Sequence, residues 1–303
     1  MTVFPKVCVL VLNYNGTEDS RRCLESIEKL SYPNFDVLFI DNGSADLSWK
    51  QMVFNFPSVY VLANGANLGY AGGNNAGIRW AMERGYEDVF ILNNDTRVST
   101  SVLSLLEKTS NDFPQATLLA PKICALEDPG RVHSLGSRMN WLRMRPEEGF
   151  FGRPDFESPR GSFLASIFPG AAILAKNKIL QMGDLFDEKF FLIHEDADVC
   201  LRNLAMGFEN RVVADAVIYH CLSKTLSRYP ALSRYYSTRN FLYLAARRAS
   251  FFQKILCAAG FVGLSVKNLA ILWRGPATSR EDSRAFFRGA LDFFKGRMGS
   301  GAV

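Results

Sequence analysis

Four runs of aliphatic and β-branched residues constrain the fold of this 303-residue chain more than any other feature. They read VCVLVLN, FDVLFID, VYVLA and DVFILN, and each ends in or just before a cluster of Asn, Asp and Gly. Continuous apolar runs of this kind are typical of strands buried on both faces of a parallel sheet. The segments between them favour helices, as the spacing of Cys23, Leu24 and Ile27 does after the first run. The alternation predicts a doubly wound α/β fold with a mostly parallel sheet flanked by helices.

The polar clusters that follow the four runs predict a binding site. They occupy positions 13–15, 41–44, 67–75 and 93–95. In doubly wound sheets, ligands bind outside the carboxyl ends of the strands. A single cluster is explained well enough by turn formation. Four clusters at equivalent strand ends favour a shared ligand site instead.

A second candidate site is the stretch FFLIHEDADVCLR, which begins at Phe191. His194, Glu195, Asp196 and Asp198 follow directly on large apolar residues, which is unusual for a solvated helix face. Acidic residues in the first turn of a helix also stabilise its dipole, so a purely structural role is the alternative. We expect a helix that begins at this acidic cluster, has Leu201, Leu204 and Ala205 among its buried positions, and stops at Gly207.

Charge is distributed unevenly along the chain. Net charge is +5, yet residues 221–303 hold 14 Lys or Arg against Glu281, Asp282 and Asp292. We therefore expect a catalytic domain over residues 1–220 and a basic, mainly helical extension over residues 221–303. The six scattered cysteines show no Cys-x-x-Cys pairing, and no secretory leader precedes them, so we expect a reducing cytoplasm and no structural zinc.

The extension includes an apolar segment, residues 251–273. Polar residues interrupt it, and the uninterrupted part, residues 255–266, is shorter than the ~20 residues that span a bilayer. We expect an amphipathic helix that packs on the catalytic domain or lies in a membrane interface. The basic charge favours an anionic membrane surface, and no module for binding nucleic acid accompanies it. The apolar stripe of this helix comprises Phe252, Leu256, Ala259, Gly263, Val266, Ala270 and Trp273.

Six motifs, in order, resemble those of the nucleotide-sugar-dependent glycosyltransferases of family 2, which have the GT-A fold. They are VLNYNG, FIDNGSAD, NLGYAGGNNAGI, LNNDT, FDEKFFLIHEDADVCLR and AVIYH, and they span residues 7–220. The NND form and the late histidine are most similar to the branch that transfers rhamnose or galactofuranose. This resemblance implies a set of residues that bind the nucleotide sugar: Asn13, Asn15, Asp41, Asn67, Gly69, Gly72, Asn74, Asn93, Asn94 and Asp95.

The resemblance also implies roles for individual side chains. Asp196 matches the general base of the family, and Glu195 orients or binds the acceptor. Asp41 is placed to accept the imide N–H of uracil or thymine, although an Asx-turn explains that position equally well. Arg202, as a partner of Asp198 or a phosphate contact, and Arg239 are candidate contacts for an acceptor or a phosphate.

A divalent metal, Mg²⁺ or Mn²⁺, is implied at Asp95 and His220. Family members often have Asp-x-Asp where this chain has Asn93-Asn94-Asp95, so Asp95 is the one charged ligand of that motif. Considered without the resemblance, a lone histidine at the end of a strand is more often structural than metal-binding.

We therefore expect an inverting glycosyltransferase. Its donor is a dTDP- or UDP-sugar, with dTDP-rhamnose favoured, and its acceptor is a cell-surface polysaccharide or a lipid-linked saccharide precursor. Gln-x-x-Arg-Trp, the motif of processive relatives, is absent after the acidic cluster, so we expect one or few sugars per encounter. We place the protein at the cytoplasmic face of the inner membrane. The main alternative is a noncatalytic module that binds a nucleotide sugar or a glycan. A sugar nucleotidyltransferase is disfavoured because no basic Gly-rich loop follows the first strand.

Overall fold

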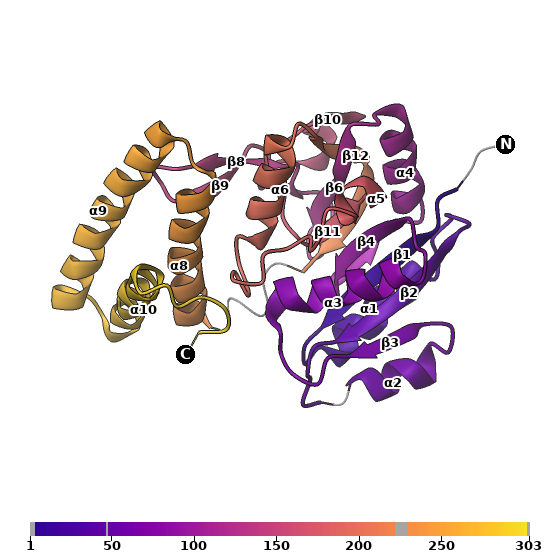
Figure 1. The fold of residues 1–303 in the computed structure, drawn as a ribbon, viewed down its shortest axis with the longest axis horizontal. Helices are drawn as coiled ribbons and strands as arrows, with labels where there is room; N and C mark the ends of the chain where they lie inside the picture. Colours follow the sequence, from indigo (N-terminus) through magenta and orange to yellow (C-terminus); the bar gives the residue numbers. More distant parts are fainter. Residues whose placement is uncertain (1–3, 47, 222–228, 302–303) are drawn as a thin grey trace.

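A ten-stranded sheet forms the centre of the protein in the computed structural model, which describes residues 4–46, 48–221 and 229–301 (Figure 1). The strand order is β10-β12-β6-β11-β4-β1-β2-β3, with β5 beside β12 and β7 beside β6. The strands are β1 (Val7–Asn13), β2 (Phe35–Asp41), β3 (Tyr60–Ala63), β4 (Asp88–Asn93), β5 (Thr96–Val98), β6 (Ala116–Ala125), β7 (Val132–Ser134), β10 (Ser162–Leu164), β11 (Ala172–Ala175) and β12 (Glu209–His220).

The four apolar runs of the sequence are strands β1 to β4. Strand β1 pairs in parallel with β2 and β4, and β2 pairs in parallel with β3. Their carboxyl ends therefore lie at one edge of the sheet, where Asn13 is opposite Asp41 and Leu12 is opposite Asn93. The other half of the sheet is mixed, because β11 runs antiparallel to both β4 and β6. The predicted α/β class is confirmed.

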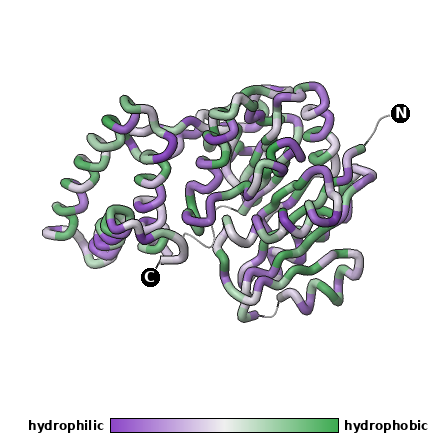
Figure 2. Tube along the Cα trace, viewed as in Figure 1, coloured by the Kyte–Doolittle hydropathy of each residue, from purple (hydrophilic) through white to green (hydrophobic). Residues whose placement is uncertain are grey.

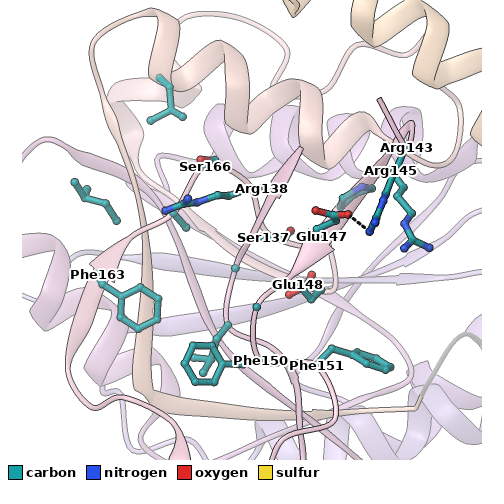
Figure 3. Close-up of a pocket in the computed structure, with 17 residues that line it drawn as sticks. Ser137, Arg138, Arg143, Arg145, Glu147, Glu148, Phe150, Phe151, Phe163 and Ser166 are labelled. Atoms are coloured by element: carbon teal, nitrogen blue, oxygen red, sulfur yellow. Dashed lines mark hydrogen bonds and ion pairs between the residues drawn. The ribbon is translucent and has the colours of Figure 1, made fainter. Parts of the chain in front are cut away.

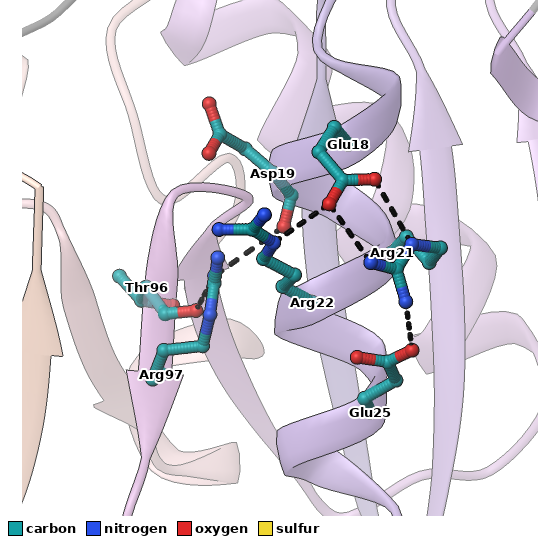
Figure 4. A network of polar contacts seen from close by, with 7 residues as sticks. All are labelled: Glu18, Asp19, Arg21, Arg22, Glu25, Thr96 and Arg97. Atoms are coloured by element: carbon teal, nitrogen blue, oxygen red, sulfur yellow. Dashed lines mark hydrogen bonds and ion pairs between the residues drawn. The ribbon is translucent and has the colours of Figure 1, made fainter.

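Helices cover both faces of the sheet and divide the apolar core in two. One core cluster includes residues of α1, α2 and α4, and the other includes residues of α3, α5 and α6. Helix α1 is also joined to strand β5, since Arg97 Nη1 lies 3.4 Å from the backbone oxygen of Asp19 (Figure 4). The bounds are α1 (Thr17–Ile27), α2 (Ser48–Asn55), α3 (Gly69–Glu83), α4 (Val102–Asp112), α5 (Asn177–Leu180) and α6 (Glu195–Ala205).

Residues 129–162 are rich in Gly, Pro and Arg and have no sustained periodicity, a pattern that predicts a mobile loop, but their structure differs from this prediction. They contain β7, a hairpin of β8 (Ser137–Asn140) and β9 (Arg145–Glu148), and a short 3-10 helix, η1 (Asp155–Glu157). Both hairpin strands lack alternating polarity, so their pairing left no periodic signal. Packing of its turn holds the hairpin in place: the ring of Trp141 contacts that of Phe241 edge-on at 5.7 Å.

Two further details differ from the sequence prediction. The segment GFENRVVADAVIYH predicts two short strands, whereas residues 209–220 form one bulged strand, β12. In helix α6, Leu204 and Ala205 are exposed, whereas the acidic residues Glu195 and Asp198 are buried. Helical periodicity located the helix correctly, and Leu201 is half-buried against the core as predicted, but the other two predicted positions are not in the core.

Three helices follow the sheet at one end of the molecule: α8 (Pro230–Arg248), α9 (Phe251–Arg274) and α10 (Ala277–Phe294) (Figure 1). Helix α9 begins with a capping box between Ser250 and Gln253. It is long and apolar enough to cross a membrane by length and composition, whereas the sequence pattern predicted an amphipathic helix that packs on the catalytic domain or lies in a membrane interface. The predicted apolar stripe is exposed, with Phe252 at 72% and Trp273 at 74%, and Figure 2 colours much of this helix as hydrophobic.

Candidate active site

A cavity of about 250 Å³ opens at the carboxyl ends of β1 and β4. Six residues that the sequence predicted for ligand or metal binding line it together: Asn67, Gly69, Asn93, Asn94, Asp95 and His220. The rest of its lining is provided by Leu12, Tyr14, Asn42, Tyr70, Phe191 and Leu192. The cavity thus joins residues from the second half of the chain to the parallel strand ends.

Asn13 lies beneath this cavity and organises it. Its side chain is fully buried, and its Oδ1 accepts from Gly16 N, Ser20 Oγ and Asn94 Nδ2 at 2.9–3.1 Å. Its Nδ2 lies 3.3 Å from Asp41 Oδ1. The sequence predicted that Asn13 binds the nucleotide sugar. Because these bonds use its polar atoms, Asn13 instead holds the ends of three strands together.

Other predicted binding residues lie outside the lining of this cavity. Asp41 is 4% exposed and accepts from the backbone N–H of Ser44, so its predicted contact with a base stays a prediction. Asn15 is exposed, with a positive φ, and accepts from Ala45 N at 2.8 Å. Asn74 is fully buried, and its Nδ2 donates to the backbone oxygen of Tyr70.

The glycines of NLGYAGG allow close packing within the protein. Gly69 has φ +73°, and a Cβ on it would lie 2.4 Å from the backbone oxygen of Phe191. A Cβ on Gly72 would meet Leu68 Cβ at 2.9 Å. The absence of a side chain on Gly69 therefore allows the first turn of α3 to lie against Phe191. Gly69 also lines the cavity, and the predicted contact of Gly69 and Gly72 with a nucleotide sugar stays a prediction.

Asp95 and His220 form the candidate metal site. His220 pairs with Thr96 across strands β12 and β5, which brings its Nε2 to 3.0 Å from Asp95 Oδ1. Asp95 Oδ1 is buried and has no hydrogen-bond partner in the described part of the chain. A carboxylate oxygen beside an imidazole nitrogen, both facing a cavity, suits a divalent ion that completes its shell with phosphate and water. No group of three or more metal-binding side chains occurs among the described residues, so these two would be the protein's share.

Asp196 is linked to the cavity through Gly170 and Tyr70. Its Oδ2 accepts from Gly170 N at 2.9 Å, and its Oδ1 accepts from Ala197 N at 2.7 Å. The hydroxyl of Tyr70, which lines the cavity, donates to the backbone oxygen of Gly170. Burial raises the pKa of Asp196 above its usual range, although hydrogen bonds from the backbone, including those of Gly170 and Ala197, act in the opposite direction. A raised pKa makes a carboxylate a stronger proton acceptor.

The chain before Asp196 is strained. Phe191, Ile193 and His194 all have φ between 64° and 74°, a region that side chains other than glycine rarely adopt. Asn240 of α8 stabilises this turn, because its Nδ2 lies 2.7–2.8 Å from the backbone oxygens of Phe190, Leu192 and Ile193.

Arg239 reinforces the same turn by donating to Phe190 O at 3.1 Å. Its side chain is fully buried. The predicted contact of Arg239 with an acceptor or a phosphate is therefore replaced by a positioning role.

Two comparisons of the sequence identify the chain. The family model described as glycosyl transferase family 2 matches residues 8–158. The dTDP-rhamnosyl transferase RfbF of Shigella flexneri is 21% identical over 244 residues, which cover 77% of this chain and 78% of that protein. An N-acetylglucosaminyl-diphospho-decaprenol L-rhamnosyltransferase of Mycobacterium tuberculosis is 25% identical over 268 residues, 81% of this chain and 86% of that protein. The chain belongs to glycosyltransferase family 2.

Solved structures show that this family 2 glycosyltransferase has the GT-A fold. The mannosyltransferase PcManGT of Pyrobaculum calidifontis, in complex with GDP-Man and Mn²⁺, superposes with a TM-score of 0.57 at 15% identity, over 98% of this chain and 89% of that chain. GalNAc-T7 with UDP, GalNAc and Mn²⁺ gives a TM-score of 0.64 at 14% identity, over 97% of this chain and 58% of that chain.

The remaining predicted residues of this family 2 glycosyltransferase have structural partners. Asp198 is fully buried and pairs with Arg248, at 2.6 Å, instead of with Arg202 as the sequence had suggested. Arg202 donates to the backbone oxygen of Leu185 and lines none of the cavities described here, so its predicted contact with an acceptor or a phosphate stays a prediction.

Three residues of this family 2 glycosyltransferase were missed by the sequence analysis. Tyr70 and Gly170 link the cavity to Asp196, and His133 stacks on His220 with ring centroids 6.0 Å apart. Tyr70 stands inside the quoted Gly-rich motif, which is the one signal that could have pointed to it.

Proposed function

We propose that the protein is an inverting glycosyltransferase that transfers a sugar from a dTDP- or UDP-sugar to a hydroxyl group of a saccharide. The favoured sugar is rhamnose, and the favoured acceptor is a cell-surface polysaccharide or its lipid-linked precursor. The names of two relatives support this choice, since one is a dTDP-rhamnosyl transferase and the other a rhamnosyltransferase named for a diphospho-decaprenol acceptor.

One relationship carries the proposal. Tyr70 lines the same cavity as Asp95 and His220. Its hydroxyl donates to the backbone oxygen of Gly170, and the backbone N–H of Gly170 donates to the carboxylate of Asp196. A candidate base is thus linked, through Gly170, to a lining residue of the cavity that also contains the two candidate metal ligands. A single in-line displacement needs both groups on opposite sides of the anomeric carbon.

The proposed reaction is a single displacement at the anomeric carbon. The carboxylate of Asp196 takes the proton of the acceptor hydroxyl, and the hydroxyl oxygen forms a bond to the anomeric carbon. The bond from that carbon to the diphosphate oxygen breaks, and the nucleoside diphosphate departs with the electron pair. One displacement inverts the configuration at the anomeric carbon. A divalent ion held by Asp95 and His220 would supply neutralisation of the charge on the diphosphate.

We also propose that residues 1–220 form the catalytic domain and that the helical extension attaches the protein to the cytoplasmic face of the inner membrane. The exposed apolar side of α9 supports this, since Phe251, Val266 and Trp273 are 63–81% exposed. Lys254, Lys267 and Arg274 are exposed on the same helix and would favour anionic lipid.

The decisive experiment replaces Asp196 with Asn. Turnover of the nucleotide sugar should fall by at least about 100-fold, as expected for loss of a general base, while affinity for the nucleotide stays unchanged. A thermal-shift panel of UDP, dTDP, GDP and their sugars, with and without Mn²⁺ or Mg²⁺, identifies the donor by its selective stabilisation. A wild-type protein that binds a nucleotide sugar yet never consumes it with any acceptor would instead be the noncatalytic module.

A further inference from the structure

A second and larger cleft, of about 1170 Å³, lies beside the β8–β9 hairpin (Figure 3). Its walls come from the hairpin, from β10 and from Leu204 of α6. The mechanism above assigns no role to this cleft. This volume is slightly larger than that of an ordinary small-molecule site, so the cleft can hold a molecule larger than one monosaccharide.

The cleft carries excess positive charge. Arg138, Arg143 and Arg145 line it, and all three are exposed. Arg143 pairs with Glu147 at 2.9 Å, whereas Arg138 and Arg145 have no ion-pair partner among the described residues. Strand register places Arg138 opposite Glu147 and Arg145 opposite Asn140, so the two unpaired arginines lie on the same face of the hairpin. Guanidinium groups gathered in this way bind phosphate through paired hydrogen bonds.

The rest of the cleft is apolar and aromatic. Phe150, Phe151 and Phe163 line it, together with Leu164 and Leu204 (Figure 3). Phe151 and Leu164 are 60% and 62% exposed. Exposed rings beside a few polar groups are typical of a site for an organic ligand. The combination suits a molecule with both a sugar ring and an anionic group.

The cleft adjoins the candidate active site at two points. At the first point, the ring of His133 stacks on that of His220, which lines the candidate active site. The same ring also contacts Phe151 of the cleft edge-on, with ring centroids 5.5 Å apart. At the second point, Glu148 lines the cleft and accepts from Ser134 Oγ at 2.8 Å. The pKa of Glu148 is raised by its burial and also by the charge of Asp196, which lies within electrostatic reach.

The arginine end of the cleft lies beside helix α9. Leu142, in the turn next to Arg143, meets α9 at Gly260, where a Cβ would approach the backbone oxygen of Leu142 closely. An anionic group bound by the arginines is therefore near the helix whose exposed side is apolar. This is where the phosphate of a membrane-anchored molecule would lie.

We propose that this cleft binds the acceptor and that Arg138, Arg143 and Arg145 hold a phosphate or diphosphate group of the acceptor. The phenylalanine rings hold its sugar, so that a hydroxyl group reaches Asp196. The inference rests on the proposed function. The phosphate belongs either to a lipid-linked saccharide or to a soluble sugar phosphate, and both sources share the chemistry that the arginines recognise.

The test is a calorimetric titration of inorganic pyrophosphate and of farnesyl diphosphate into the full chain, without divalent metal. The triple variant Arg138→Gln, Arg143→Gln, Arg145→Gln should bind both at least about tenfold more weakly, because it loses the charged hydrogen bonds that the three guanidinium groups donate to phosphate. A matched control, Lys29→Gln, Arg84→Gln, Lys108→Gln, removes the same charge from exposed positions outside the described cavities. It should bind as the wild type does.

Equal affinities in the wild type and the arginine variant would overturn the proposal, as would an equal loss in the control. If the triple variant melts early, the single variants Arg138→Gln and Arg145→Gln decide the same question. Tighter binding of farnesyl diphosphate than of pyrophosphate by the wild type identifies a lipid-linked source, and equal binding identifies a soluble one. Because the titration needs no donor, failure of the nucleotide-sugar panel would refute the proposed function without changing this result.

Discussion

Nε2 of His220 lies 3.0 Å from Oδ1 of Asp95, although the two residues belong to segments far apart in the chain. The antiparallel pairing of β12 with β5 produces this contact, and the two atoms face a cavity bordered by Asn93 and Asn94. With one carboxylate and one imidazole as ligands, a bound ion would depend strongly on each of them.

His220→Ala and Asp95→Asn should each weaken Mn²⁺ binding by about 10- to 100-fold in the presence of UDP or dTDP, the range seen when groups that hold or orient a metal are removed. Calorimetry with Mn²⁺ measures this. His133→Ala is the control, because it removes the neighbouring ring and neither ligand. Unchanged Mn²⁺ affinity in both site variants would place the ion elsewhere.

The pH dependence of turnover should reveal Asp196. Burial raises its pKa, so the base is protonated and inactive at a higher pH than an ordinary aspartate would be. We expect kcat/KM to rise with pH through this raised pKa and then to level off. The acid limb should disappear from the residual rate of Asp196→Asn. If the limb persists in that variant with the same midpoint, another group is the base.

Glu195 should make the stability of the protein depend on pH. It is buried, its Oε2 has no hydrogen-bond partner in the described residues, and burial raises its pKa well above the usual range. The folded state therefore holds a proton that the unfolded state releases, so its contribution to stability is present at low pH and lost as pH rises. The loss is at most about 1.4 kcal/mol per pH unit for one group.

Glu195→Gln removes that titration. The melting temperature of the variant relative to the wild type should increase between pH 5 and pH 8, as measured by calorimetry. Glu157→Gln, at an exposed position, is the control. A difference in melting temperature that stays constant with pH would show that Glu195 ionises normally in the folded protein.

The features of the fold and the site that the sequence predicted are those encoded by residues close together in the chain. Strands β1 to β4 are continuous apolar runs, and the residues after them, including Asp95, lie at the predicted edge because parallel strands end together. The start of α6 at Glu195 was also predicted, since its acidic first turn and its stop at Gly207 are local features.

The missed features depend on contacts between distant segments. Gly170 binds Asp196 from another part of the chain, and nothing in its own neighbourhood indicates this. Asn13 has the sequence position of a ligand contact, yet its polar atoms bond to Asp41 at the end of β2, to Asn94 after β4 and to Ser20 of helix α1. The β8–β9 hairpin has no alternating pattern and is held by contacts with α8 and α9.

Asn240 provides a test of the strained turn before Asp196. Replacing it with Leu would leave the backbone oxygens of Phe190, Leu192 and Ile193 without this donor, at a cost of about 1–3 kcal/mol for each one that finds no other partner. We expect a lower melting temperature and a fall in kcat, with nucleotide affinity unchanged. Asn268→Leu is the control, because within the described part of the chain that buried asparagine donates to Leu264 O of its own helix and to no loop. If Asn240→Leu lowers stability but leaves kcat intact, the turn does not position the base.

Membrane attachment through α9 can be tested with vesicles. Phe252, Val266 and Trp273 are 63–74% exposed on this helix, and burying such side chains in lipid contributes about 1.5–3 kcal/mol each. The triple variant with Ser at these positions should sediment with vesicles of phosphatidylglycerol and phosphatidylethanolamine at least about 100-fold less strongly than the wild type. Phe54→Ser and Phe156→Ser, whose rings are 86% and 81% exposed on other parts of the surface, are the controls. Equal sedimentation of the α9 variant and these controls would mean that the helix faces something other than lipid.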